Sequence, residues 1–512
     1  MTASSRGGSL VIALDVGTSS VRALLFDVRA SPQPGAEVHL PYRPRVTADG
    51  GAEVDARRLL ALVEKAVQDL LESAGPQRRR RIAAVGISTF WHGLCGADDA
   101  GRPLTPLYLW SDNRSWRQAD RLRQALDDEA VRQRTGCLLH PTYWPAKLAW
   151  LKEGGTAVWG RRPHWVSIGE LLTWRLFGRP LTSLSMASGT GIMLLRERRW
   201  DLALLEALEV GPDSLPEVAE SARGLGRRHA RRWPELAQVP WFTAAGDGAL
   251  ANLGSGCVAP RLRAITIGTS GALRVMTATP PRAIPPGLWC YRLDGERLVM
   301  GGALSNGGNL HAWFLKTLAL DERGGERWLA RMAPGAHGLT FVPLLAGERS
   351  PGYAPHATGA VAGLTSATLP EDIVRAGMEA VAIEFARVDA LLDLAAPAPE
   401  ALVASGAALL ASPAWMQMAA DAVGRRVTVG PAREASSRGA AIRAIEGLGL
   451  GRPEEWAGRP GRSFEPRPEA TRAYRAERVR QEALYRVLVA ERLLDRPLHE
   501  RARAVQAAAG LG

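Results

Sequence analysis

The sequence predicts an α/β protein built from two related domains. Two stretches, 13–22 and 264–272, share one pattern: an apolar run, then Gly-Thr-Ser, then a second apolar run. Apolar runs of strand length alternate with helical patterns along most of the chain, which is typical of α/β folds. The 512 residues are also enough to form two sizeable cores.

Both Gly-Thr-Ser stretches are predicted to be the tips of β-hairpins, because an apolar run stands on each side of them. A tip of this composition presents backbone N–H groups and small hydroxyls, which suits a polyphosphate. Two such tips indicate two halves that face one nucleotide; two unrelated hairpins with ordinary glycine turns are the alternative. The residues concerned are Gly17, Thr18 and Ser19 in the first tip and Gly268, Thr269 and Ser270 in the second.

The two copies differ at the position two residues before the glycine. This position is Asp15 in the first copy and Thr266 in the second. A carboxylate beside phosphates is suited to holding Mg²⁺ through water. The sequence therefore predicts a magnesium ligand at Asp15 and none at the matching place in the second half.

The composition is that of a soluble globular protein, with 46% hydrophobic and 23% charged residues. No apolar run approaches the length of a membrane span, and the first ten residues lack a signal-peptide core, so we expect a cytoplasmic protein without membrane contact. The four scattered cysteines show no Cys-x-x-Cys spacing, which predicts reduced thiols and no zinc site. The net charge of +12 comes from arginines spread over the whole length, and we expect no nucleic-acid partner.

The first candidate substrate segment follows the strand-like run 82–87. Trp91, His92 and Gly93 stand where this strand is predicted to end, and ligands of open α/β sheets bind at strand ends. Together they offer an aromatic wall, a hydrogen-bonding imidazole and room for close approach. The alternative for His92 is a buried histidine whose hydrogen bonds are satisfied within the protein.

Two further segments of the first half carry candidate substrate residues. The run 104–110 ends at Trp110 and leads to Asp112 and Arg114, whose polar groups suit recognition of a polyol. A helix N-cap at residues 111 or 112 with a surface arginine is the alternative there. Lys147, one of four lysines in the chain, follows an aromatic stretch that also holds a histidine, so it is a candidate for a ligand wall.

Asp247 is the candidate general base. It lies between two glycines, after the strand-like run 239–243 and before the helix-like run 249–253. A carboxylate at such a turn is unshielded and can take a proton from a substrate hydroxyl. Its position about 20 residues before the second Gly-Thr-Ser tip would let the two share a cleft. A simple helix cap is the alternative.

A third turn of interest follows the apolar run 402–405. Gly406 and Ala407 form a turn that can lay its backbone against a flat adenine, and a helix is predicted just after it. The segment from residue 454 onward is rich in Arg, Glu and Pro and ends in the helix-like run 477–494. We interpret it as an appendage without chemistry.

The two tips resemble the phosphate-one and phosphate-two loops of the actin, heat-shock chaperone and sugar-kinase superfold. From about residue 10 to about residue 445 the chain resembles the FGGY carbohydrate kinases, the gluconokinase branch most of all. The resemblance implies two actin-like (ribonuclease H-like) domains with ATP, Mg²⁺ and substrate in the cleft between them. The domains are expected at 1–255 and 256–453, followed by a helical tail at 454–512.

The resemblance also implies roles for single residues. Asp247 is the base, Asp15 holds the metal, and the two tips hold the phosphates. Gly406, Ala407 and Gln417 match the adenosine region, where Ser405 replaces the first of two glycines common in the family and would narrow the adenine slot. The sugar-facing residues are Trp91, His92, Gly93, Trp110, Asp112 and Arg114.

These features predict a kinase that phosphorylates a hydroxyl of a sugar or sugar acid. D-gluconate is favoured over xylulose, another pentulose or polyol, and glycerol, because its carboxylate would be matched by His92, Arg114, His140 and Lys147. A P-loop kinase is disfavoured because no Gly-x4-Gly-Lys-Ser/Thr is present. A chaperone-like ATPase of the same superfold would lack the base and the polar pocket. The sequence leaves open whether the protein forms a homodimer.

Overall fold

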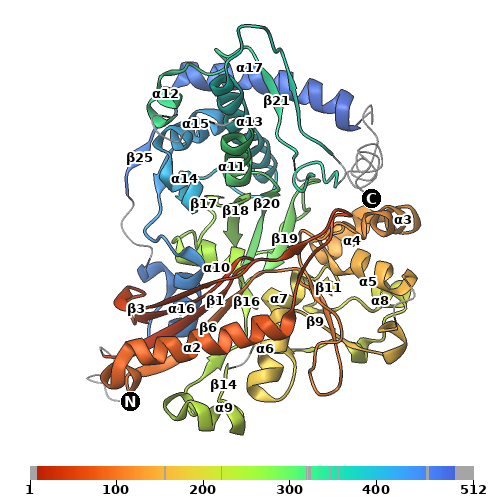
Figure 1. Ribbon diagram of the computed structural model, residues 1–512, viewed down its shortest axis with the longest axis vertical. Helices are drawn as coiled ribbons and strands as arrows, with labels where there is room; N and C mark the ends of the chain where they lie inside the picture. Colours follow the sequence, from red (N-terminus) through yellow and green to blue (C-terminus); the bar gives the residue numbers. More distant parts are fainter. Residues whose placement is uncertain are drawn as a thin grey trace.

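The structure is a computed structural model that describes residues 8–154, 157–220, 222–318, 320, 325–345, 347–355, 357–456 and 461–490. It has two α/β halves, one above the other in Figure 1, and each is built on a seven-stranded sheet. This confirms the predicted fold class with two related halves. Among the described residues, no helix is both long enough and apolar enough to cross a membrane.

The first sheet has the strand order β14-β15-β6-β1-β2-β3, and β16 also pairs with β6. The predicted first hairpin is β1 and β2, which are antiparallel, whereas β6 runs parallel to β1. All seven residues of β1 are buried, so this strand lies in the middle of the core. The strands are β1 (Leu10–Val16), β2 (Ser20–Asp27), β3 (Pro32–Pro41), β6 (Ile82–Thr89), β14 (Ala222–Arg223), β15 (Trp241–Phe242) and β16 (Ala245–Gly246).

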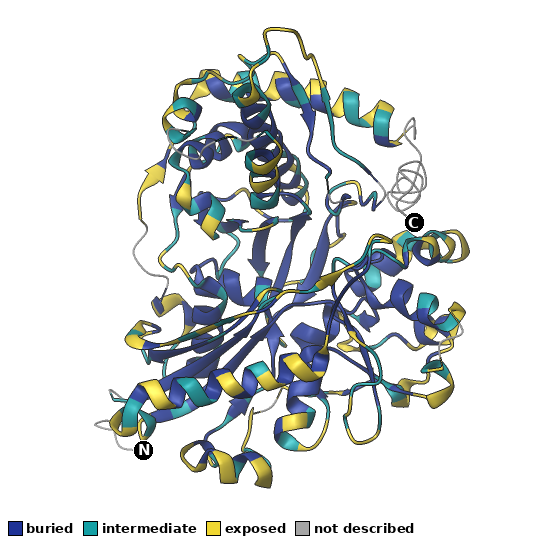
Figure 2. Ribbon diagram, in the orientation of Figure 1, coloured by how far each residue is buried: buried dark blue, intermediate teal, exposed yellow. Residues whose placement is uncertain are grey.

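The amphipathic pattern after the first hairpin forms helix α2 (Ala56–Arg79), which packs on β2 and β3. Asp55 caps it by accepting the N–H groups of Arg57 and Arg58. Apolar residues three and four positions apart are buried on one face, and Figure 2 shows the opposite face exposed to solvent. Three short strands beside its start form a small sheet: β4 (Arg45–Val46), β5 (Ala52–Val54) and β8 (Leu107–Tyr108).

A mostly helical lobe is inserted between β6 and β15, and it fills the lower right of Figure 1. It has its own apolar cluster, built around Trp144, Leu148 and Leu204. The helices of the lobe are α3 (Trp116–Ala125), α4 (Asp128–Thr135), α5 (Trp144–Glu153), α6 (Ile168–Phe177), α7 (Leu184–Ser188) and α8 (Leu202–Leu208). Helix α9 (Arg227–Arg232) follows β14 at the bottom of Figure 1 and pairs with Glu64 of α2. Its small strands include β7 (Cys95–Ala97), β9 (His164–Val166), β11 (Met193–Leu194) and β12 (Arg199–Trp200).

The second sheet repeats the plan of the first. Its order is β19-β20-β18-β17-β23-β24-β25, with β17 and β18 antiparallel and β23 parallel to β17. The strands are β17 (Leu262–Ile267), β18 (Gly271–Thr277), β19 (Trp289–Arg292), β20 (Leu298–Leu304), β23 (Ala401–Ser405), β24 (Val427–Val429) and β25 (Ser463–Phe464). The helices around it are α11 (Gly308–Thr317), α12 (Gly325–Arg331), α13 (Pro370–Leu392), α14 (Ala407–Ala411), α15 (Pro413–Val423) and α17 (Pro468–Tyr485).

Helix α16 (Ala435–Gly447) packs differently from its place in the sequence. It falls within 256–453, but it lies on β1 and β6 and crosses α10 (Asp247–Gly254), so it belongs to the first core. Glycines permit this close approach: a Cβ at Gly439 would overlap the Leu250 carbonyl, and one at Gly86 would overlap the Ala440 carbonyl. The chain thus returns to the first half after completing the second sheet.

The tail is not the separate appendage that we expected. Helix α17 buries Tyr474 and Gln481 while it packs on α13 and α15 of the second half. It begins at Pro468, earlier than predicted, and a short π-helical turn follows at 486–490. The rest of the predicted segment 477–494, and the chain beyond it, lie outside the described residues.

Replacing Gly86 by Ala tests the contact between α16 and β6. The added methyl must fit against the Ala440 backbone and the Ala444 side chain, so we expect a loss of roughly 1–3 kcal/mol in the free energy of unfolding. Gly211→Ala is the matched control, because open space surrounds that position and its φ is negative. Urea denaturation measures both variants, and equal stability of the two would contradict the close packing of α16.

Candidate active site

The tips of the two hairpins face the same cleft, which has a volume of about 660 Å³. In each tip the glycine N–H closes the turn, but the turns differ in length: Gly17 donates to the Ser20 carbonyl at 2.9 Å, and Gly268 donates to the nearer Ser270 carbonyl at 3.0 Å. The residues of the tips that line the cleft are Thr18, Ser19, Gly268, Thr269 and Ser270. Backbone and hydroxyl groups from both halves can therefore reach one polyphosphate.

Asp247 lines the cleft at the first turn of α10. The N-cap of this helix is Gly246, so the alternative of a capping aspartate does not hold, although one carboxylate oxygen accepts the Gly248 N–H at 2.7 Å. Burial raises the pKa of Asp247 to about 6, and the negative charge of Asp15 acts in the same direction. A carboxyl group with such a pKa can accept a proton near neutral pH.

Asp15 is the last residue but one of β1, behind the first tip, and is 5% exposed. Its two oxygens accept hydrogen bonds from Ser88 at 2.7 Å and from Ser437 of α16 at 3.3 Å. Burial raises its pKa, while Arg22 at 3.8 Å opposes the rise. Asp15 lies behind the lining of the cleft, so it fits a Mg²⁺ ion that keeps most of its waters and is held through them. Within the described chain no three His, Cys, Asp or Glu residues gather into an all-protein metal cage.

Trp91 supports the turn that carries Asp247. A Cβ at either neighbouring glycine, Gly246 or Gly248, would overlap the Trp91 ring, so only glycines let the turn lie on the indole. The indole N–H donates to the Ser185 carbonyl at 2.9 Å, and the ring meets Tyr291 of β19 edge to face. Trp91 therefore lies beneath the cleft and supports the turn of Asp247, instead of lining the cavity as an aromatic wall.

His92 and Gly93 also lie under the cleft and not in its lining. His92 has a φ of +67°, and its Nδ1 is 2.5 Å from the Gly189 carbonyl. Burial and the nearby charge of Arg349 lower the pKa of His92 well below its ordinary value, so the ring is neutral. The Gly93 carbonyl accepts the Trp144 indole N–H at 3.0 Å. These contacts match the alternative of a buried, satisfied histidine.

Asp112 and Arg114 brace one wall of the cleft. Asp112 accepts the Ala52 N–H at 3.0 Å and pairs with Arg114, whose guanidinium also meets Glu53 at 2.8 Å. Arg114 lies over the Trp150 ring as well. Both side chains are therefore occupied by the protein, while their neighbours Trp110, Ser111 and Asn113 line the cavity.

Lys147 is not placed to meet a substrate carboxylate. It is 1% exposed, and its Nζ donates to the carbonyls of Pro141 and Thr142, each at 2.6 Å. Burial lowers its pKa to about 7. The lysine instead fixes the loop that presents His140 and Thr142 to the cleft. Lysine is rare in this sequence, and the lysine that stood out for this reason has a structural role.

Arg349 is the cation that sequence reasoning missed. It lines the cleft, and its guanidinium carbon lies 5.0 Å from the centre of the Trp110 ring. Its Nε is buried and has no hydrogen-bond partner among the described residues. The available signal was weak: an arginine in a short polar stretch between two glycines, Gly347 and Gly352.

A second cavity of about 560 Å³ opens beside the second tip, between α11, α14 and α15. Its lining includes Gly308, Leu315, Ala408 and Trp415, so one side is apolar enough for a flat base. Gly406 and Ala407 directly precede Ala408, and the φ of Gly406 is +90°. A Cβ at Gly406 would overlap the Ile267 carbonyl, which explains the glycine.

Two expectations for this region change. Gln417 does not line either cavity, because its amide donates to Asp421 at 3.0 Å and to the Glu465 carbonyl at 2.8 Å. Ser405 does not line the second cavity, and its hydroxyl lies 2.8 Å from that of Thr266 behind the second tip. The serine thus ties β23 to β17 instead of narrowing the adenine slot.

Comparison with known proteins accounts for both halves. Residues 10–254 match the N-terminal domain, and residues 263–446 the C-terminal domain, of the FGGY family of carbohydrate kinases. A gluconokinase of Bacillus subtilis is 28% identical over 86% of this chain and 88% of its own length. A glycerol kinase of Halorhodospira halophila is 31% identical over 95% of this chain and 98% of its own.

The solved structures agree with this assignment. The ligand-bound xylulose kinase from Lactobacillus acidophilus superposes with a TM-score of 0.86 at 26% identity, covering 94% of this chain and 98% of that one. The actin-like (ribonuclease H-like) architecture that the resemblance implied is thereby confirmed. With both domain models matched in order along most of its length, this chain belongs to the FGGY family of carbohydrate kinases.

Proposed function

We propose that this kinase transfers the γ-phosphoryl group of ATP to D-gluconate and forms 6-phosphogluconate. The observation that carries the proposal is Arg349, a cation with an unpaired buried Nε in the same cleft as Asp247. The similarity to the gluconokinase of Bacillus subtilis supports it independently.

A sugar acid needs a cation at one end of the cleft and a base at the other. Arg114 and Lys147 are held by internal partners. His140 lines the cleft, but burial lowers its pKa well below its ordinary value, so its ring is neutral. This leaves Arg349 to meet a carboxylate. A charge-assisted hydrogen bond contributes about 1.5–3 kcal/mol, or roughly 10- to 150-fold in affinity. Trp110 under the guanidinium holds its plane, so that its fork can face the carboxylate.

Asp247 performs the proton transfer. Its carboxylate accepts the proton of the attacking hydroxyl while the hydroxyl oxygen bonds to the γ-phosphorus and the bond to ADP breaks. The N–H and hydroxyl groups of the two tips hold the transferring phosphoryl group. Arg274, which lines the cleft and donates to Asn252 at 2.9 Å and to Thr266 at 2.8 Å, adds fixed positive charge.

Mg²⁺ would be held through water by Asp15 beside the phosphates, where it would neutralise part of their charge. Asp15 keeps its orientation through Ser88 and Ser437, so its oxygens are fixed before any ion binds. The apolar cavity next to Ala408 would receive the adenine.

A neutral pentulose is the alternative substrate, with glycerol third. The structural similarity to a xylulose kinase and the sequence similarity to a glycerol kinase favour these candidates. A coupled ADP-release assay over gluconate, xylulose, ribulose and glycerol at equal concentration separates them. A neutral ketose exceeding gluconate tenfold in kcat/KM would overturn the gluconate assignment and leave the kinase activity intact.

Asp247→Asn removes the proton acceptor without changing the size of the side chain. We expect transfer to fall by ~10²–10⁴, the usual contribution of a general base, while ADP still binds in calorimetry. A variant that keeps more than a third of the wild-type rate would remove Asp247 from the mechanism.

The pH profile should report the same carboxyl group. Because Asp247 must be deprotonated to act, and its pKa is raised to about 6, kcat/KM should fall below about pH 6 and not near pH 4, the value for an unperturbed Asp. Steady-state rates from pH 4.5 to 8, corrected for acid unfolding by circular dichroism, measure this. A flat profile down to pH 5 would contradict the assignment.

Arg349→Gln should separate acid from neutral substrates. We expect kcat/KM for gluconate to fall roughly 10- to 150-fold, with a much smaller change for xylulose, and Arg349→Lys to recover part of the loss. Arg114→Gln is the contrast, since Arg114 braces the wall through Asp112 and Glu53 and should affect both sugars alike. Equal losses for both sugars in Arg349→Gln would exclude it as the carboxylate partner.

A further inference from the structure

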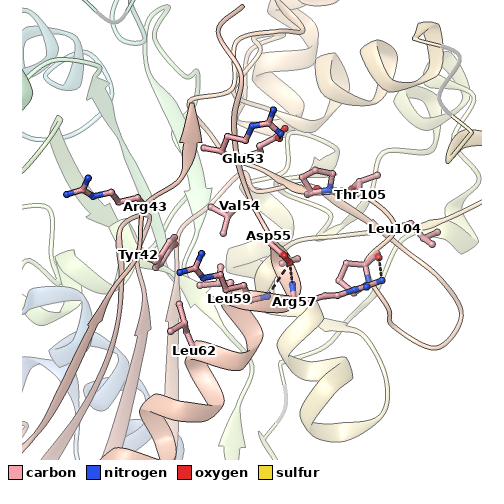
Figure 3. Close-up of a pocket in the computed structure, with 15 residues that line it drawn as sticks. Tyr42, Arg43, Glu53, Val54, Asp55, Arg57, Leu59, Leu62, Leu104 and Thr105 are labelled. Atoms are coloured by element: carbon pink, nitrogen blue, oxygen red, sulfur yellow. Dashed lines mark hydrogen bonds and ion pairs between the residues drawn. The ribbon is translucent and has the colours of Figure 1, made fainter. Parts of the chain in front are cut away.

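A separate pocket of about 480 Å³ lies on the first domain at the start of α2, and Figure 3 shows its lining. None of its residues lines the catalytic cleft. Its floor is apolar or aromatic, and its rim is cationic. The floor includes Tyr42, Val54, Leu59, Leu62 and Leu104, and the rim has Arg43, Arg45, Arg57 and Arg58.

The carboxylates of this pocket do not neutralise the rim. Glu53 is already shared between Arg45 at 3.2 Å and Arg114 at 2.8 Å, and Asp55 accepts two backbone N–H groups at the start of α2. The Arg57 side chain donates to the Pro103 carbonyl at 3.2 Å, as the dashed line in Figure 3 marks. Within the described chain, no acidic side chain pairs with Arg43, Arg57 or Arg58. The rim therefore keeps an excess of positive charge.

This pocket and the catalytic cleft share a thin wall. In the segment 42–46, Tyr42, Arg43 and Arg45 line the pocket, whereas Pro44 and Val46 line the cleft. The segment 50–55 also borders both spaces, because Gly50 to Ala52 line the cleft and Glu53 to Asp55 line the pocket. Strands β4 and β5 pair antiparallel across this wall, with Arg45 opposite Glu53.

Tyr42 connects the pocket floor to the first tip. Its hydroxyl donates to the Gly17 carbonyl at 2.5 Å, and its own N–H donates to the Ser19 carbonyl at 2.9 Å. The side chain is 8% exposed, so a ligand on the pocket floor would rest on a ring that is bonded directly to the phosphate-binding turn.

We propose that this pocket is a second binding site for a small phosphorylated metabolite, a phosphate monoester on a sugar-sized carbon body. Through Tyr42, a ligand bound in this pocket changes the nucleotide affinity of the first tip. Guanidinium groups match phosphate geometry, while the apolar floor takes the carbon body. The volume suits one small molecule rather than a macromolecular partner.

Isothermal titration with D-glucose 6-phosphate tests the site on the full chain, with the cleft saturated by the preferred sugar and a non-hydrolysable ATP analogue. We expect one saturable site, stronger than for inorganic phosphate and stronger than for D-glucose. If no saturable binding is seen at ligand concentrations up to ~10 mM, the proposal is overturned. Binding no stronger than that of inorganic phosphate would overturn the role of the carbon body. The assay reads binding and not turnover, so its outcome is independent of which sugar is phosphorylated.

The double variant Arg43→Gln, Arg58→Gln should weaken this binding roughly tenfold or more, as expected for lost charge-assisted bonds. The matched control is Arg227→Gln, Arg231→Gln on α9, which removes the same charge from exposed arginines far along the chain. Equal weakening in both double variants would mean that only net charge matters and would overturn the pocket.

The link through Tyr42 has its own test. In the wild type we expect the affinity for D-glucose 6-phosphate to differ by about fivefold or more with and without the ATP analogue, since coupling between sites is reciprocal. Tyr42→Phe keeps the ring and loses the bond to Gly17, so it should still bind but show the same affinity in both states. The Arg43, Arg58 double variant measured without nucleotide reports any binding to the empty cleft. A wild-type affinity that ignores the nucleotide would overturn the link.

Discussion

The return of α16 to the first sheet is the constraint on which the cleft depends. Arg438 of this helix is buried and donates to the carbonyls of Ala30, Gly254 and Trp456, so one side chain joins the sheet region, the end of α10 and the following turn. Glycines at the crossing let the α10 and α16 backbones approach closely. Because α10 begins at Asp247 and α16 carries Ser437 to Asp15, this crossing sets the two carboxylates relative to each other.

The cationic residues around the cleft fall into two groups, those with internal partners and those that line the cavity. Arg114 and Lys147 have all the partners they need inside the protein and therefore stabilise walls and loops. Arg349 and Arg274 keep unmet or cleft-facing groups and come from the second half. Asp247, the proposed base, comes from the first half, so the proposed reaction requires both halves, which agrees with phosphoryl transfer by positioning and fixed charge.

The C-terminal helix α17 contacts the segment that carries Arg349. Tyr485 of α17 donates to Glu348 at 2.6 Å, and Glu348 directly precedes Arg349. Burial and the charge of Glu384 raise the pKa of Glu348 to about 7. The C-terminal helix therefore supports the residue beside Arg349, the cation that lines the cleft. A charged, Pro-rich stretch gave no sign of this, because the partner lies 137 positions away in the sequence.

The sequence alone determined the two hairpins, their shared Gly-Thr-Ser tips and an aspartate between glycines before a helix, because these depend on local periodicity and turn chemistry. Only the tertiary structure decided which polar residues reach the cleft. Trp91, Asp112 and Lys147 stand in segments that do approach it, but their side chains meet internal partners. Arg349 and the packing of α16 depend on contacts between distant segments, and no local pattern encodes which way a side chain points across such a contact.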